Sequence, residues 1–143
     1  MKKKIVGLML AVIALFALSG CDGTDVVYVD PEPTEVTLFL VDWHGEGIEY
    51  VPYICYAPDG SIVTDFETDF FGEFSFVPGD RCVFDLFGFD GDIVTPLFIT
   101  DDMGYGKDDI PYECVNKMNA LSGTTDLNGY FEYPIDAFCK FYL

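Results

Sequence analysis

The sequence reads VTLFLVDWHGEGIEYVPYIC at residues 36–55 and TPLFITDDMGYGKDDIPYEC at residues 95–114, at an offset of 59. Eight of the twenty aligned positions are identical, including a D-x-x-G-x-G segment and a P-Y-x-C segment in each stretch. After a deletion of two residues the match resumes, and Cys82 aligns with Cys139. Because Gly, Cys and aromatic positions agree this often, we interpret the chain as an internal duplication.

Each copy has the sequence pattern of β-strands. Short runs rich in β-branched and aromatic residues alternate between apolar and polar positions, as in Gly72–Phe76, and turn dipeptides such as Asp59-Gly60 separate them. Only Val115–Leu121 could form a helical turn. We therefore predict an all-β protein of about eight strands, with β repeat 1 at residues 36–90 and β repeat 2 at 95–143 packed as one domain.

Four cysteines occupy equivalent positions in the two copies. Four cysteines allow three pairings, and the duplication favours Cys55–Cys82 with Cys114–Cys139, because each copy then carries the same bridge. Bridges over loops of about 25 residues contribute on the order of 3–4 kcal/mol each. The wide spacing and the absence of a C-x-x-C pair argue against zinc and against a redox site.

The N-terminus has the features of an export signal. Three lysines precede an uncharged run from Ile5 to Leu18, which is too short to cross a bilayer. The segment Leu18-Ser-Gly-Cys21 resembles the lipobox of bacterial lipoproteins. This resemblance implies a signal peptide at residues 1–20, acylation of Cys21 and anchoring in a lipid bilayer, in the outer membrane or on the periplasmic face of the inner membrane. Acids and prolines over residues 21–35 predict an extended tether.

Charge and composition exclude several classes of function. The net charge is −18, and loss of residues 1–20 leaves four basic residues against 25 acidic ones. Such a chain repels nucleic acid, whereas an aromatic content of 17% excludes a disordered acidic tail. The single histidine, His44, has Met103 at its equivalent position, and no nucleophile motif accompanies it. We therefore expect no enzymatic activity.

The turns and core positions of the first copy carry a family resemblance. The segments D-x-x-G-x-G-I (42–48), V-P-Y-x-C (51–55) and T-D-x-x-G-x-F-x-F-x-x-G-D (68–80) resemble the carboxypeptidase-regulatory-like and Cna-B-like modules of bacterial surface proteins. The second copy departs from this pattern, because Ile135-Asp-Ala137 replaces the Gly-Asp turn. The resemblance implies a prealbumin- or Ig-like β-sandwich with a structural role, or one in binding an envelope protein or glycan.

Two further hypotheses concern side chains around the glycine turns. Carboxylates on flexible turns suit Ca²⁺, so a calcium-dependent binding or sensing protein is the alternative function. The candidate ligands are Asp42, Asp101, Asp102, Asp108 and Asp109. The tyrosines and the tryptophan near these turns either fill a core that is short of aliphatic bulk, which we favour, or form a binding surface. The candidates for that surface are Trp43, Tyr50 and Tyr105.

Overall fold

The computed structural model describes residues 34–143, so the predicted signal peptide, Cys21 and most of the predicted tether lie outside the described residues. The described residues form nine β-strands in two antiparallel sheets and no helix, which confirms the all-β class. The strands are β1 (Val36–Asp42), β2 (Pro52–Tyr56), β3 (Ile62–Glu67), β4 (Glu73–Phe76), β5 (Arg81–Asp85), β6 (Leu97–Thr100), β7 (Pro111–Val115), β8 (Ala120–Thr124) and β9 (Phe138–Tyr142). A search of the described part of the chain found no helix long and apolar enough to span a membrane.

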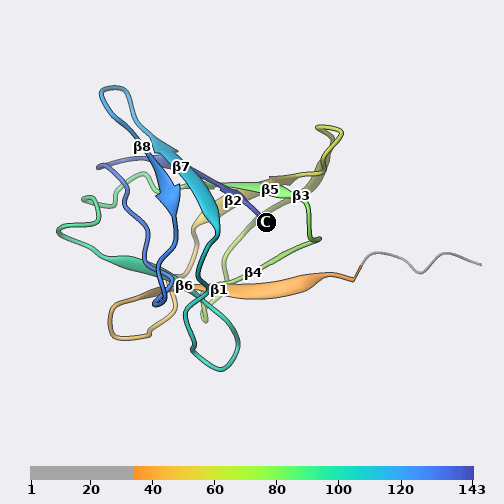
Figure 1. Cartoon of the computed structure of the whole chain (residues 1–143), viewed down its shortest axis with the longest axis horizontal. Helices are drawn as coiled ribbons and strands as arrows, with labels where there is room; N and C mark the ends of the chain where they lie inside the picture. The colour runs from red at the N-terminus through yellow and green to blue at the C-terminus, as the bar shows by residue number, and fades with distance from the viewer. Residues whose placement is uncertain (1–33) are drawn as a thin grey trace, which may run out of the picture. The chain divides into compact units, whose positions relative to one another are not determined.

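The two sheets form a β-sandwich. The smaller sheet has the order β4-β1-β6 and the larger one β3-β2-β5-β9-β7-β8. Figure 1 labels strands of both sheets. The alternation expected from the sequence is observed, since Phe74 and Phe76 on one sheet and Phe84 and Phe141 on the other are buried between them. Their rings meet edge to face, with 4.8 Å between the centroids of Phe74 and Phe84. The core therefore combines aromatic rings with aliphatic side chains such as Leu40, Leu97 and Ile99.

The strand pairing is the same when the two halves are exchanged. On β1 and β6, Leu40 lies opposite Ile99, its counterpart at an offset of 59, and the flanking pairs exchange in the same way. On β5 and β9, Val83 lies opposite Lys140, its counterpart at an offset of 57. A local two-fold relation thus lies between β1 and β6 in one sheet and between β5 and β9 in the other, and residues 34–143 belong to one compact unit.

One predicted strand of the second half does not form. β4 pairs with the first half of β1, where Thr37 lies opposite Ser75. The position equivalent to Thr37 is Pro96, which has no N–H to donate to a ladder. The side chain of Asp92 instead accepts a hydrogen bond from the Tyr133 backbone at 3.3 Å. Residues 130–133 therefore keep only an isolated bridge, between Phe98 and Tyr130.

The segment Val115–Leu121 is part of a hairpin between β7 and β8, so the helical turn considered for it is wrong. The side chain of Asn116 accepts hydrogen bonds from the N–H groups of Met118 and Asn119, at 2.8 and 2.7 Å. Asn side chains stabilise turns by such bonds to the following backbone. The hydrogen bonds to Asn116 thus favour a hairpin in a segment whose apolar pattern does not distinguish a helical turn from a strand.

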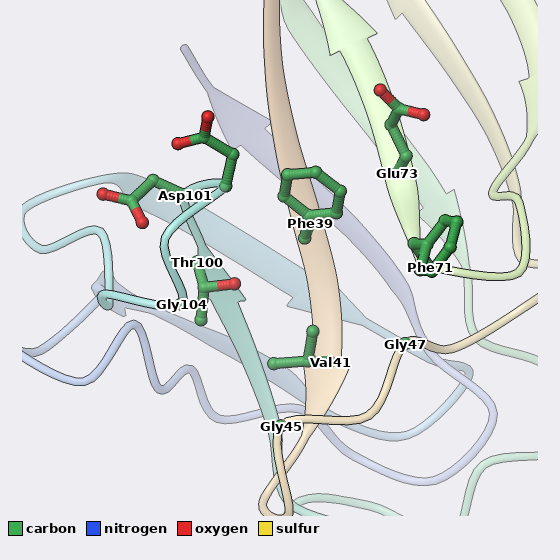
Figure 2. Close-up of a pocket in the computed structure, with 10 residues that line it drawn as sticks. Phe39, Val41, Gly45, Gly47, Phe71, Glu73, Thr100, Asp101 and Gly104 are labelled. Carbon is green, nitrogen blue, oxygen red and sulfur yellow. The ribbon is translucent and has the colours of Figure 1, made fainter.

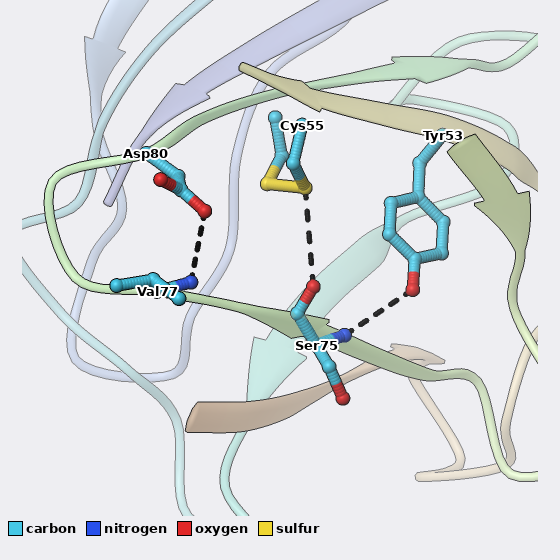
Figure 3. Close-up of a disulfide and its surroundings, with 6 residues drawn as sticks. Tyr53, Cys55, Ser75, Val77 and Asp80 are labelled. Carbon is cyan, nitrogen blue, oxygen red and sulfur yellow. Dashed lines mark hydrogen bonds between the residues drawn. A yellow bond between two sulfur atoms is a disulfide. The ribbon is translucent and has the colours of Figure 1, made fainter. Parts of the chain in front are cut away.

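Both disulfides join the pairs expected from the repeat, Cys55–Cys82 and Cys114–Cys139. Each joins residues directly opposite one another on neighbouring strands, with Cα atoms 4.0 Å apart. Figure 3 shows the first bridge facing β4, where a Cys55 sulfur lies 3.9 Å from the Ser75 carbonyl oxygen. Because a disulfide sulfur carries no hydrogen, this is a packing contact. Both bridges are fully buried and belong to the core.

A buried threonine braces the same loop in each half. The Thr68 hydroxyl donates to the carbonyl of Ile48 at 2.6 Å and accepts from the N–H of Val51 at 2.9 Å. In the second half the Thr125 hydroxyl makes the equivalent bonds with Lys107 and Ile110, at 2.6 and 3.0 Å. Both threonines are almost completely buried. They satisfy backbone groups that the bend before β2 and β7 would otherwise leave without partners.

Candidate interaction surface

Four turns of sequence Asp-x-x-Gly have the same hydrogen bonds. In the first, Asp42 Oδ1 accepts from the N–H groups of His44 and Glu46 at 2.9 and 3.0 Å, and the Asp42 carbonyl accepts from Gly45 at 2.9 Å. The glycine has a positive φ in every one, which few other residues adopt without strain. The four turns are 42–45, 69–72, 101–104 and 126–129.

These turns border the smaller sheet and contact one another in pairs. The Gly72 carbonyl oxygen accepts a hydrogen bond from the N–H of Leu40 at 2.8 Å, and an added Cβ at Gly72 would overlap the Leu40 carbonyl. An added Cβ at Gly47 would overlap the Phe71 backbone, and one at Gly106 would overlap the Asn128 backbone. Backbone packed this closely, and hydrogen-bonded within each turn, fixes the positions of the residues at the turn tips.

The tips of the four turns carry large apolar side chains that face solvent. Trp43 is 69% exposed and Leu127 is 81% exposed, and the other turns present residues of similar exposure. We call these turns and their exposed side chains the turn face: Trp43, Phe70, Phe71, Met103 and Leu127, with the neighbouring Tyr50 and Tyr105. Large apolar side chains that are exposed close together on a folded domain favour an interaction site.

The tyrosines and the tryptophan near the glycine turns were expected to fill the core, and only some of them do. Tyr53 and Tyr112 are buried, and their hydroxyls accept hydrogen bonds from the backbone of Ser75 and Glu132 at 3.3 and 2.9 Å. Burial raises the pKa of both phenols. Trp43, Tyr50 and Tyr105 are exposed, so the core interpretation is wrong for these three. Tyr50 has a positive φ of 65°, which directs the chain around the bend before β2.

A hollow of about 500 Å³ lies on the outer side of the smaller sheet, between two of these turns. Figure 2 shows Phe39 and Val41 of β1 in the middle, Glu73 and Phe71 on one side, and Asp101 on the other. We call it the Phe39 hollow. Its remaining lining residues are Gly45, Gly47, Thr100, Asp102 and Gly104. It combines apolar surface with carboxylates from two separate turns.

The carboxylate of Glu73 is perturbed by its neighbour. A hydrogen bond with the Asp69 carboxyl, partial burial and the charge of Asp69 all raise the pKa of Glu73 above its usual value. Although burial opposes it, the pKa of Asp69 is lowered, because the N–H groups of Glu73 and Phe71 donate to Asp69 Oδ1. The Glu73 carboxyl therefore holds a proton more readily than an isolated glutamate does, and Asp69 holds one less readily than an isolated aspartate.

The five aspartates proposed as calcium ligands do not come together as a set. No group of three or more His, Cys, Asp or Glu side chains suited to a metal ion occurs among residues 34–143. Asp42 and Asp101 each use one carboxylate oxygen to hold their turns. Asp109 has a positive φ of 59° at the position equivalent to Tyr50, and its N–H donates to the Thr125 carbonyl. Of the five, Asp101 and Asp102 line the Phe39 hollow.

A second apolar groove, of about 590 Å³, lies beside the β7–β8 hairpin. Sequence reasoning did not find it, because its residues come from three separate segments and have no common motif. They are Phe87, Val115, Asn116, Lys117, Met118, Ile135, Asp136 and Phe138. At the equivalent end of the first half, Arg81 donates to the Ala57 carbonyl at 3.3 Å and takes the place of Phe138.

The structure therefore defines an all-β sandwich with two buried disulfides and an apolar, acidic face built on four matching turns. No protein-family model, curated protein or solved structure matches the chain.

Proposed function

We propose that the protein is a lipid-anchored module of the bacterial cell envelope, which binds an envelope protein or glycan through the turn face. The observation that carries this proposal is the exposure of large apolar side chains on four turns whose backbone is fixed by hydrogen bonds. Side chains displayed on rigid backbone lose little entropy when they bind, which favours recognition.

The sequence supports the anchored location. Leu18-Ser-Gly-Cys21 resembles a lipobox, and the residues between Cys21 and Glu35 are rich in acids and proline. A multiply acylated cysteine anchors a protein stably, whereas a single chain gives only marginal binding. Such an arrangement would hold the sandwich near a membrane surface, within reach of envelope partners.

A duplicated origin of the sandwich is part of the same proposal. The matching registers at Leu40–Ile99 and Val83–Lys140 support it, as do the matching disulfides and the paired threonine braces. The resemblance to Cna-B-like and carboxypeptidase-regulatory-like modules suggests the role, since those modules serve mostly as stalks, spacers and binding units. Duplication would double the number of Asp-x-x-Gly turns available for display on one face.

Photo-crosslinking in intact bacteria tests the proposal. A photoreactive residue at Glu46, which is exposed beside the turn face, is expected to crosslink the full-length protein to a discrete envelope partner. The variant Trp43→Ser/Phe70→Ser should lose this product, whereas Ile62→Ser/Phe66→Ser, which removes exposed apolar side chains from edge strand β3, should keep it. Equal crosslinking in both variants would refute a role for the turn face.

The anchor is tested separately by labelling with an alkyne-bearing fatty acid. The wild-type chain should take up the label and remain with the membrane fraction, and Cys21→Ala should do neither. Membrane association of the unlabelled Cys21→Ala chain would contradict lipid anchoring.

A further inference from the structure

The Phe39 hollow is lined by residues of both halves, and the groups beside Phe39 differ from those at the equivalent positions around Phe98. This difference indicates what the hollow holds. In the second half, the counterpart of Phe39 is Phe98, and the counterpart of Glu73 is Tyr130. The rings of Phe98 and Tyr130 pack with their centroids 5.7 Å apart, and the Tyr130 hydroxyl donates to Asp92. In the first half no such ring covers Phe39, because Glu73 presents a carboxylate there instead.

The groups that line the hollow fit one kind of side chain. The Phe39 ring and Val41 provide apolar surface, the Phe71 ring stands at the edge, and Glu73 and Asp102 provide negative charge. Lysine and arginine have a long apolar stem and a cationic end, so they bury the stem on apolar surface while the charge meets carboxylates. Arginine also stacks on aromatic faces and pairs with carboxylates through two hydrogen bonds.

We propose that the Phe39 hollow receives an arginine or lysine side chain from a basic segment of the protein partner, an inference that rests on the proposed function. The stem lies on Phe39 and Val41, and the charged end lies between Glu73 and Asp102. The partner is therefore a cationic protein segment rather than a neutral glycan.

The distribution of charge over residues 34–143 supports a cationic partner. This part of the chain carries 21 acidic residues against four basic ones. Arg81 and Lys140 belong to the larger sheet, Lys117 belongs to the β7–β8 hairpin, and only Lys107 lies in a segment next to the turn face. A positively charged partner would be attracted to this face over long range, and an anionic partner would be repelled.

The test uses the full-length protein in detergent and a short capped peptide, Gly-Arg-Gly, observed by the NMR shifts of the Val41 methyl groups. The matched probe is the same peptide with citrulline, which has the shape of arginine without its charge. The arginine peptide is expected to shift the Val41 signals in a saturable way, and the citrulline peptide should bind at least tenfold more weakly. Equal binding of the two peptides would overturn the proposal.

Three variants separate a local site from the general acidity of the protein. Glu73→Tyr copies the second half and should fill the hollow, so the arginine-dependent shift should disappear while the melting temperature stays close to that of the wild type. Glu73→Gln should weaken binding by about tenfold, since a lost tenfold in affinity corresponds to about 1.4 kcal/mol. Asp65→Asn removes the same charge from the exposed strand β3 and should change binding less than twofold. Equal weakening by Glu73→Gln and Asp65→Asn would overturn the inference.

Crosslinking of the Glu73→Tyr protein distinguishes failure of this inference from failure of the proposed function. Loss of the partner product in Glu73→Tyr, as in Trp43→Ser/Phe70→Ser, is the expected result. A product that depends on Trp43 and Phe70 but survives Glu73→Tyr would refute the cationic side chain and leave the turn face as the binding site. A product independent of all three residues would refute the proposed function itself.

Discussion

Removal of one buried hydroxyl group tests whether the bends before β2 and β7 depend on their threonine braces. In Thr68→Val a methyl group replaces the hydroxyl with almost no change of shape. The Ile48 carbonyl then loses a donor at 2.6 Å, and the Val51 N–H loses an acceptor at 2.9 Å. Because residue 68 is only 1% exposed, water cannot readily replace either bond.

The expected cost follows from these two unsatisfied groups. A buried backbone donor or acceptor left without a partner costs about 1–3 kcal/mol, so the two groups together should lower the free energy of unfolding of Thr68→Val by about 2–6 kcal/mol. Thr68→Ser keeps the hydroxyl and loses one methyl group, which is worth about 1 kcal/mol. Thr125→Val should cost the same as Thr68→Val, since its bonds have nearly the same lengths.

Urea unfolding of the oxidised protein, followed by tryptophan fluorescence and circular dichroism, measures these differences. Thr124→Val, at an exposed position on β8, is the control and should change stability by less than 0.5 kcal/mol. The m-value should stay constant, which shows that the change lies in the folded state. A loss below 1 kcal/mol in Thr68→Val, or an equal loss in Thr68→Ser, would refute the argument from hydrogen bonding.

Three other predictions follow from the same structure. Gly72→Ala should destabilise the fold by several kcal/mol, because its Cβ would overlap the Leu40 carbonyl. Gly45→Ala has open space around it and should cost only about 1–2 kcal/mol, the strain of an alanine with a positive φ. Equal urea midpoints for the two variants would contradict this. The two disulfides join cysteines that are 27 and 25 residues apart, so their reduction should lower the free energy of unfolding by about 3–4 kcal/mol per bridge. An unchanged thermal midpoint in reductant would contradict this prediction. Burial raises the pKa of Tyr53 and Tyr112 above 10.0, so these tyrosines ionise first in the unfolded state. Their contribution to the free energy of unfolding should be constant below pH 10 and be lost above it, and phenolate absorbance that rises before unfolding would contradict this.

The sequence predicts the parts of the fold that depend on local pattern and on the repeat. Alternation identifies the inward side chains of β4 and β5, and the equivalence of the cysteines selects the pairing of Cys55 with Cys82. Pro96 could also have signalled the missing strand of the second half, since a proline cannot donate to a ladder. The contribution of Asp92 could not be anticipated, because it depends on where the chain between the two halves crosses the sheet.

The candidate site was less predictable, because exposure is decided by tertiary packing. Trp43 and Tyr53 are both aromatic residues near the same turn, yet one is exposed and the other is buried. A strand position fixes the direction of Tyr53, whereas Trp43 lies at a turn tip where no period applies. The Phe39 hollow depends on residues from three segments, so only the folded chain brings them together.

Equivalent positions of the two halves differ most on the outer side of the smaller sheet, and this difference indicates which surface binds a partner. The core aromatics, the disulfides, the threonine braces and the turn aspartates are matched between the halves, as expected of groups that stability requires. On the outer side of the smaller sheet the match ends, because Glu73 corresponds to Tyr130 and Trp43 to Asp102. Stability alone would favour a tyrosine at residue 73 as well, packed against Phe39, since the Phe98–Tyr130 contact partly covers both rings. With a glutamate at residue 73 this ring contact is absent, and the hollow beside Phe39 stays open and lined by carboxylates. This is the arrangement expected if this face binds a partner.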